Sequence, residues 1–132
     1  MLSRLILLSK DGTGMPSFFY KLFGLKAGKN CHIGGHIFEP HLITLGNHVH
    51  IGYDAILSGH MFNDNTKKMT VGKINIRSNV LIGARSTISP NTQIGDNVII
   101  GAYSFVKIGS NLKANSVYAG IPVKRIKKIQ KS

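Results

Sequence analysis

One of the six histidines, His60, stands where an imidazole could do acid–base chemistry. It ends the short segment SGH, directly before a polar stretch over residues 63–69 with the sequence NDNTKKM. Imidazole titrates near neutral pH, so it can take a proton from an attacking hydroxyl or amine and later release it. A loop at this point could wall off a pocket beside the imidazole. We therefore predict that His60 acts as a general base.

The remaining candidates for chemistry are weaker. Five histidines are expected to be polar residues that turns tolerate: His32, His36, His41, His48 and His50. The single cysteine, Cys31, falls on an inward position of a six-residue repeat, so we do not expect it to carry an acyl group. One cysteine also excludes an intrachain disulfide framework and favours a reducing compartment.

The six-residue repeat must position these side chains. It begins at Ala27 as AGKNCH, IGGHIF, EPHLIT, LGNHVH, IGYDAI and LSGHMF, and it resumes at Thr70 as TVGKIN, IRSNVL, IGARST, ISPNTQ, IGDNVI and IGAYSF. Most of the twelve units open on an aliphatic residue, and a small or aliphatic residue returns four places later. Sandwiches and barrels have strands separated by variable turns, and helices repeat at 3.6 residues, so neither explains a strict period of six.

Stacking explains why such short units can fold. One strand of five or six residues cannot bury its apolar side chains, whereas stacked repeats cover one another and share a continuous core. Glycine is common at the second position and asparagine near the turn, where both accept backbone angles that other residues resist. The sequence therefore predicts an all-β fold, a parallel β-helix, in which the aliphatic residues form inward ladders.

The repeat, the histidine before a loop and the end of the chain together resemble the hexapeptide-repeat acyltransferases. The carrying segments are AILSGHMFND and IGDNVIIGAYSFV leading to SVYAGIPVKRI, in which Gly120, Pro122 and Lys124 match the family's ending and Ile121 replaces its usual asparagine. The resemblance covers about residues 25–129 and implies a left-handed β-helix of about four coils. It implies transfer of an acetyl group from acetyl-CoA to a hydroxyl of a sugar or polysaccharide precursor, with His60 as base.

The resemblance also implies where the co-substrate binds. Small residues should line the path of the pantetheine arm, and lysines should approach the phosphates: Ala84, Ala102, Lys107, Lys124 and Lys127. If the loop replaces no hexad, units three apart share a face, so His60, Arg85 and Tyr103 should form one column. Arg85 could then bind an anionic group of the acceptor or of the co-substrate. No metal is expected.

Three regions are expected along the chain. Residues 1–26 form an apolar segment that caps the coil stack or, alternatively, dips into a membrane surface beside Lys10, Lys21 and Lys26. Residues 27–132 form the β-helix domain, with residues 63–69 expelled as a loop. The basic run that follows Pro122 is expected to form a short helix.

The net charge of +12, from 17 basic and 5 acidic residues, favours acidic partners. No nucleic-acid motif is present, so the expected partners are a phosphorylated co-substrate, a saccharide acceptor or an anionic membrane touched peripherally. The initial apolar run is too short for a signal peptide or a membrane span, which favours a cytoplasmic protein, with the inner membrane face as an alternative. The family resemblance further implies a homotrimer with sites between subunits.

Three alternatives remain open. The acceptor could be an amino group on an amino sugar or nucleotide sugar, which would make the protein an N-acetyltransferase. A γ-type carbonic anhydrase also uses a left-handed β-helix, and His36 and His41 have a suitable separation, but His60 has no matching partners and the ending would be unexplained. A non-catalytic β-helix scaffold would keep the repeat and lack the activity.

Overall fold

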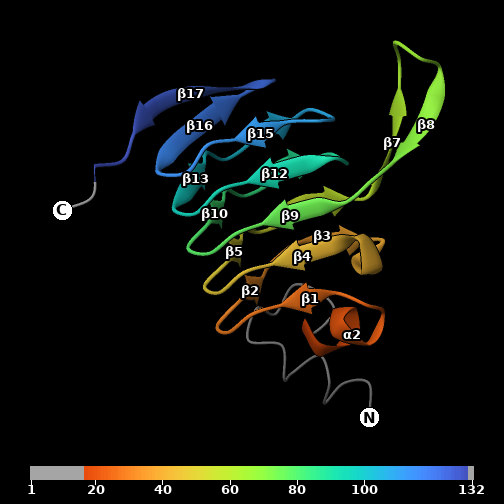
Figure 1. Cartoon of the computed structure of the whole chain (residues 1–132), viewed down its shortest axis with the longest axis horizontal. Helices are drawn as coiled ribbons and strands as arrows, with labels where there is room; N and C mark the ends of the chain where they lie inside the picture. Colours follow the sequence, from red (N-terminus) through yellow and green to blue (C-terminus); the bar gives the residue numbers. More distant parts are fainter. Residues whose placement is uncertain (1–16, 131–132) are drawn as a thin grey trace.

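The computed structural model describes residues 17–130, which wind into a stack of parallel strands with three sheets (Figure 1). Sheet A contains β1 (Lys26–Ala27), β4 (Ile43–Leu45), β9 (Ile74–Ile76), β12 (Thr92–Ile94) and β15 (Asn111–Leu112). Sheet B contains β2 (His32–Ile33), β5 (His50–Ile51), β10 (Leu81–Ile82), β13 (Val98–Ile100), β16 (Ser116–Gly120) and β17 (Val123–Lys128). Sheet C contains β3 (His36–Phe38), β6 (Ile56–Ser58), β11 (Thr87–Ile88) and β14 (Phe105–Val106).

The chain passes from sheet A to sheet B to sheet C and then begins the next turn. In Figure 1 the strands of sheet A cross the front from right to left, the chain returns behind them, and it rises toward the C-terminus, which is a left-handed winding. Five strands in sheet A give about five turns. The repeat predicted about four, because the chain continues to coil after Phe105 through β14, β15 and β16.

The predicted inward ladder is confirmed. The aliphatic residues that open the repeat units are all buried: Ile33, Leu45, Ile51, Leu57, Ile76, Ile82, Ile88, Ile94 and Ile100. Parallel pairing holds them in register, for example Ile51 with Ile82 and Ile82 with Ile100. Residues at the fifth position share this interior, although Cys31 and Met61 are only half-buried.

We expect Ile82→Ala to destabilise the fold strongly. The Ile82 side chain is fully buried between Ile51 and Ile100, so its truncation removes apolar contacts and leaves a cavity that the rigid stack fills poorly. The expected loss is about 2–5 kcal/mol of unfolding free energy. Urea unfolding followed by circular dichroism measures it, and Leu81→Ala, a neighbouring change on the exposed side of the same strand, should cost less than half as much.

Corners of the stack place non-glycine residues in the left-handed region. The corner between sheets A and B mostly uses asparagine there, at Asn30, Asn79, Asn97 and Asn115. Some glycines are required by close stacking instead. A Cβ on Gly83 would lie 2.4 Å from the backbone nitrogen of Ala102 on the next turn, so no larger residue fits without shifting a coil.

The polar stretch before Thr70 leaves the stack as a hairpin. Strand β7 (His60–Asn63) pairs antiparallel with β8 (Lys68–Val71), and the hairpin rises beside the later coils from the start of β9 (Figure 1). The units LSGHMF and TVGKIN therefore share one place in the stack, because the hairpin interrupts it in the middle. This shifts the alignment of every later unit by one place.

Both ends of the stack are covered. Helix α2 (Ser17–Leu22) lies beneath β1, and Tyr20 and Leu25 are buried with the core. Burial raises the pKa of Tyr20, so its hydroxyl stays protonated at neutral pH. Residues 1–16 of the predicted cap lie outside the described residues. None of the helices described within residues 17–130 could span a bilayer.

The expected basic helix at the C-terminus is wrong. Residues Val123–Lys128 form β17, which pairs antiparallel with β16. The upper edge of β16 would otherwise present unpaired backbone groups, and β17 satisfies them. Its exposed lysines in turn discourage further strand addition.

Candidate active site

His60 is the first residue of the hairpin strand β7, at the point where the chain leaves sheet C. Its Nδ1 is hydrogen-bonded to Oε1 of Glu39, which opens the corner one turn below. The two side chains are 44% and 27% exposed, respectively, so the imidazole is accessible and the carboxylate is mostly covered. The structure thus supplies a carboxylate–imidazole pair at the base of the hairpin.

The neighbours of this pair fix its position. Oε2 of Glu39 accepts a hydrogen bond of 3.1 Å from the backbone N–H of Gly59. A Cβ on Gly59 would lie 2.9 Å from Cδ1 of Leu42 and 3.3 Å from the Cβ of Glu39, so a larger residue would displace these side chains. Ser58 Oγ donates to the carbonyl oxygen of His60 at 2.6 Å and lies 3.5 Å from Nδ1. Contacts of Ser58 and Gly59 therefore hold the His60–Glu39 pair in place.

This geometry selects one tautomer. A carboxylate only accepts hydrogen bonds, so Nδ1 of His60 carries the proton that Glu39 accepts, and Nε2 is left with its lone pair. Such an imidazole can remove a proton from a hydroxyl or an amine, and the carboxylate stabilises the imidazolium that forms.

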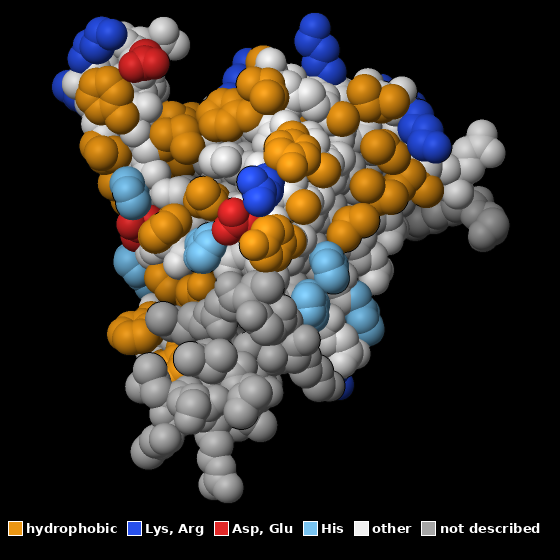
Figure 2. Space-filling view, turned by 180° about the vertical axis from the view of Figure 1, so that it is seen from behind, with side chains coloured by type: hydrophobic (Ala, Val, Ile, Leu, Met, Phe, Trp, Pro, Cys, Tyr) orange, Lys and Arg blue, Asp and Glu red, His pale blue; other side chains and the backbone are white. Residues whose placement is uncertain are grey.

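The hairpin carries an exposed apolar face beside His60. His60 pairs with Val71 and Phe62 pairs with Met69, so all four side chains lie on one side of the ribbon. Phe62, Met69 and Val71 are 53%, 56% and 62% exposed. Figure 2 shows hydrophobic side chains on the projecting hairpin and on the coils next to it. A two-stranded ribbon is marginally stable by itself, so this face is suited to being covered.

The predicted column of His60, Arg85 and Tyr103 is wrong. Thr87 pairs with Ile56 and with Phe105, so Arg85 lies in register with Asp54 and Tyr103. Backbone hydrogen bonds agree: Arg85 N–H donates to Tyr53, and Tyr103 N–H donates to Ala84. The cause is that LSGHMF and TVGKIN together fill one unit of the stack. His60 therefore lies after the strands of sheet C, whereas Arg85 and Tyr103 lie before them. The Arg85 guanidinium lies 5.9 Å from the centre of the Tyr53 ring instead.

The predicted small residues do form a track. Ala84 and Ala102 stack at the corner before sheet C, and Gly120 continues the column one turn above. Lys124 on β17 pairs with Ala119, next to the upper end of this track. Lys127 pairs with Val117 farther along β17, and Lys107 follows β14, so neither lies in the same column.

His60 and the small-residue track (Ala84, Ala102 and Gly120) lie at opposite ends of the strands of sheet C. The track precedes β11 and β14, whereas His60 follows β6. Within one chain, sheet C separates His60 from the track. A reaction that needs both would have to bring these two ends together across a boundary between chains.

The sequence did not predict Glu39 as the partner of His60. A corner of the first turn is two residues short, because His32 pairs with His50 whereas His36 pairs with Ile56. This shift places Glu39 under Gly59. The same shortened corner lets His36 Nε2 reach Asp54 Oδ1 at 2.9 Å, a second histidine–carboxylate pair away from the hairpin. Within residues 17–130, no group of three potential metal ligands occurs.

Comparisons with known proteins connect this chain to a family of transferases. The family described as "Bacterial transferase hexapeptide (six repeats)" matches residues 73–108. Galactoside O-acetyltransferase of Escherichia coli (strain K12) is 34% identical over 77% of this chain, and the chain spans 56% of that enzyme's length. This chain thus corresponds to about half of that relative.

Two solved structures are similar in fold. An acetyltransferase of Vibrio cholerae O1 biovar eltor in complex with acetyl-CoA has a TM-score of 0.73 at 20% identity, covering 82% of this chain and 62% of that one. A single-residue mutant of AntD, an N-acyltransferase from Bacillus cereus in complex with dTDP and coenzyme A, has a TM-score of 0.56 at 25% identity, covering 89% and 91%.

Proposed function

This chain belongs to the hexapeptide-repeat acyltransferase family, and on that premise we propose that it transfers an acetyl group from acetyl-CoA to a hydroxyl of a sugar or polysaccharide precursor. The observation that carries the proposal is the His60–Glu39 pair at the base of the hairpin. Nε2 of His60 removes the hydroxyl proton as the oxygen attacks the thioester carbonyl. The new C–O bond forms, the C–S bond breaks, and the imidazolium returns its proton to the departing thiolate.

The small-residue track supports the donor's place. Ala84, Ala102 and Gly120 leave room for a flexible pantetheine arm against the backbone, and Lys124 stands near the upper end to balance phosphate charge. Lys107 and Lys127 are kept as further phosphate contacts. Arg85, which follows Ala84 on the same corner, is assigned to an anionic group of donor or acceptor.

A homotrimer is part of the proposal. The base and the track occupy opposite ends of the strands of sheet C, and the apolar face beside His60 is exposed in a single chain. Packing that face against a neighbouring chain would cover it and would bring one chain's base to another chain's track. Size-exclusion chromatography with light scattering tests the trimer.

The proposal also includes a cytoplasmic location, which the free thiol of Cys31 supports. The exposed Leu22 and Phe23 beside Lys21 and Lys26 support a peripheral contact with an anionic membrane.

Two further functions are tested alongside. AntD, at 25% identity, is an N-acyltransferase whose structure contains dTDP, which favours an amino acceptor linked to a nucleotide. A scaffold would keep the stack without binding coenzyme A. The experiment follows acetyl-CoA consumption with a panel of hydroxyl and amino sugars, free and nucleotide-linked, and identifies products by mass spectrometry. An ester product supports the proposal, an amide product supports the N-acetyltransferase, and failure to bind coenzyme A leaves the scaffold.

We expect Ala102→Leu to weaken use of acetyl-CoA. Ala102 is exposed, so the larger side chain leaves the core intact but occupies the track. The KM for acetyl-CoA should rise about tenfold, because the leucine side chain displaces part of the pantetheine arm from the surface on which it packs. Ala102→Gly keeps the track open and should leave this KM within twofold. An unchanged KM for the leucine variant would place the donor elsewhere.

A further inference from the structure

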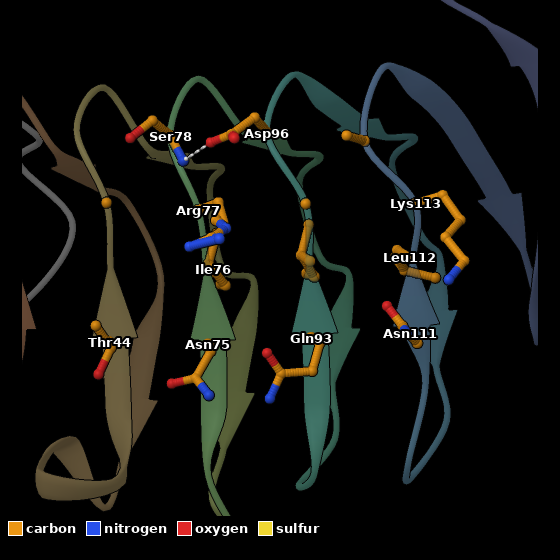
Figure 3. Close-up of a pocket in the computed structure, with 14 residues that line it drawn as sticks. Thr44, Asn75, Ile76, Arg77, Ser78, Gln93, Asp96, Asn111, Leu112 and Lys113 are labelled. Carbon is orange, nitrogen blue, oxygen red and sulfur yellow. Dashed lines mark hydrogen bonds between the residues drawn. The ribbon is translucent and has the colours of Figure 1, made fainter.

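A hollow of about 810 Å³ lies on the outer face of sheet A, and neither His60 nor the small-residue track lines it. It crosses β4, β9, β12 and β15 and extends to the corner that follows them (Figure 3). We call it the sheet A groove. Its lining consists of polar, charged, aliphatic and glycine residues and includes no aromatic side chain.

The middle of the sheet A groove is a ladder of hydrogen-bonding side chains. Figure 3 shows Thr44, Asn75, Gln93 and Asn111 in one row across the four strands. They pair directly, Thr44 with Asn75, Asn75 with Gln93, and Gln93 with Asn111. Within residues 17–130, no hydrogen bond joins these side chains to another protein group, so the amides and the hydroxyl can bind a ligand.

A second row lies two residues farther along each strand, and every second strand contributes a positively charged residue to it. By register it consists of Gly46, Arg77, Gly95 and Lys113. Arg77 and Lys113 occupy the repeat position that glycine fills in most units. Neighbouring strands lie about 4.8 Å apart, which separates the two cations along the stack by about 10 Å.

These cations are not neutralised locally. The ion pairs found within residues 17–130 involve histidines, so neither Arg77 nor Lys113 has a carboxylate within 4 Å there. The one carboxylate of the groove, Asp96, accepts a hydrogen bond of 2.9 Å from the backbone N–H of Ser78. With Arg77 and Lys113 against Asp96, the groove keeps an excess of positive charge.

We propose that the sheet A groove binds an acidic oligosaccharide laid along the stack, with its hydroxyl and N-acetyl groups on the amide ladder and its carboxylates on Arg77 and Lys113. Arginine and lysine suit carboxylates, and the amides suit sugar hydroxyls, whereas bound nucleic acid would want aromatic stacking partners. The spacing favours a polymer with an anionic group on every second ring. The inference deepens the proposed function, on which it rests, because it names the acceptor as a long acidic saccharide that is anchored on sheet A.

Binding is tested by isothermal titration calorimetry of the full chain with a hyaluronan hexasaccharide, which carries a carboxylate on every second ring. Hexagalacturonate and the neutral maltohexaose serve as comparison ligands. The hyaluronan hexasaccharide should bind most tightly. Arg77→Ala and Lys113→Ala should each weaken it about tenfold, the usual effect of losing a charge-assisted hydrogen bond. Lys21→Ala, which removes an equal charge on α2, should change affinity less than twofold.

Three outcomes would overturn the inference. Maltohexaose could bind as tightly as the acidic saccharides, or all three variants could bind the hyaluronan hexasaccharide with equal affinity. Either result would show that Arg77 and Lys113 do not bind its carboxylates. Coenzyme A could displace the hexasaccharide competitively, and the groove would then belong to the donor. Circular dichroism shows whether each variant is folded, which is expected because both cations are exposed.

The experiments distinguish failure of the proposed function from failure of the groove inference. If the acidic chain binds in the groove but no saccharide is acetylated, the transferase assignment is wrong and the saccharide site stands. If short sugars are acetylated while no hexasaccharide binds, the transferase stands and the groove inference is wrong. If both hold, the double variant Arg77→Ala/Lys113→Ala should lose its preference for long acceptors and keep its rate on monosaccharides.

Discussion

His60→Ala should lower kcat for acetyl transfer by about 10²–10⁴-fold, the usual contribution of a general base. Glu39 and Ser58 both contact the ring at Nδ1, so neither is placed to replace the imidazole Nε2. Coenzyme A affinity should stay within twofold, because His60 is proposed to hold the acceptor's proton, whereas the small-residue track and Lys124 hold the donor. Steady-state kinetics with the best acceptor of the panel, together with calorimetry of coenzyme A binding, measures both effects.

The chain offers a matched control for this variant. His36 also pairs with a carboxylate, that of Asp54, and its side chain is exposed to a similar extent, but it lies on the first turn away from the hairpin. His36→Ala should keep kcat within twofold. Equal losses in the two variants would show that His60 supports the fold rather than the reaction, and full activity of His60→Ala would remove it from the mechanism.

Glu39→Gln should lower kcat on the order of a hundredfold while the KM values for both substrates stay nearly constant. A glutamine can donate its amide N–H to Nδ1 of His60, which favours the tautomer with the proton on Nε2 and removes the base. The expected loss is smaller than that of the histidine variant because the imidazole itself remains. Initial-rate kinetics in both substrates separates kcat from KM.

Rescue distinguishes orientation from stability. Glu39→Asp keeps a carboxylate and should recover at least part of the rate, although the shorter side chain also loosens the contact with Gly59. Thermal melting of both variants should lie close to that of the wild type, because Glu39 is outside the buried core. A glutamine variant with kcat within threefold of wild type would show that Glu39 does not orient the base.

Several elements could be predicted because they depend on local order in the chain. The hexad period predicts which side chains point inward, and parallel stacking keeps like positions above one another, so the buried ladder from Ile33 to Ile100 follows directly. The break at residues 63–69 likewise predicts an excursion just after His60. Here the pattern and the fold use the same repeat length, so the position within a unit decides burial.

The site depends on which residues of different turns lie in register, and the six-residue period does not specify this. Glu39 meets His60 because a corner of the first turn is two residues short, and Arg85 leaves the predicted column because the hairpin divides one unit between two sequence segments. Strand β17 replaces the predicted helix because the edge of β16 has backbone groups to satisfy. The hexad pattern alone predicts the coil, its core and the histidine at the excursion. Which residues of different turns meet depends on the folded stack, because an insertion or a shortened corner changes the sequence separation between residues in register.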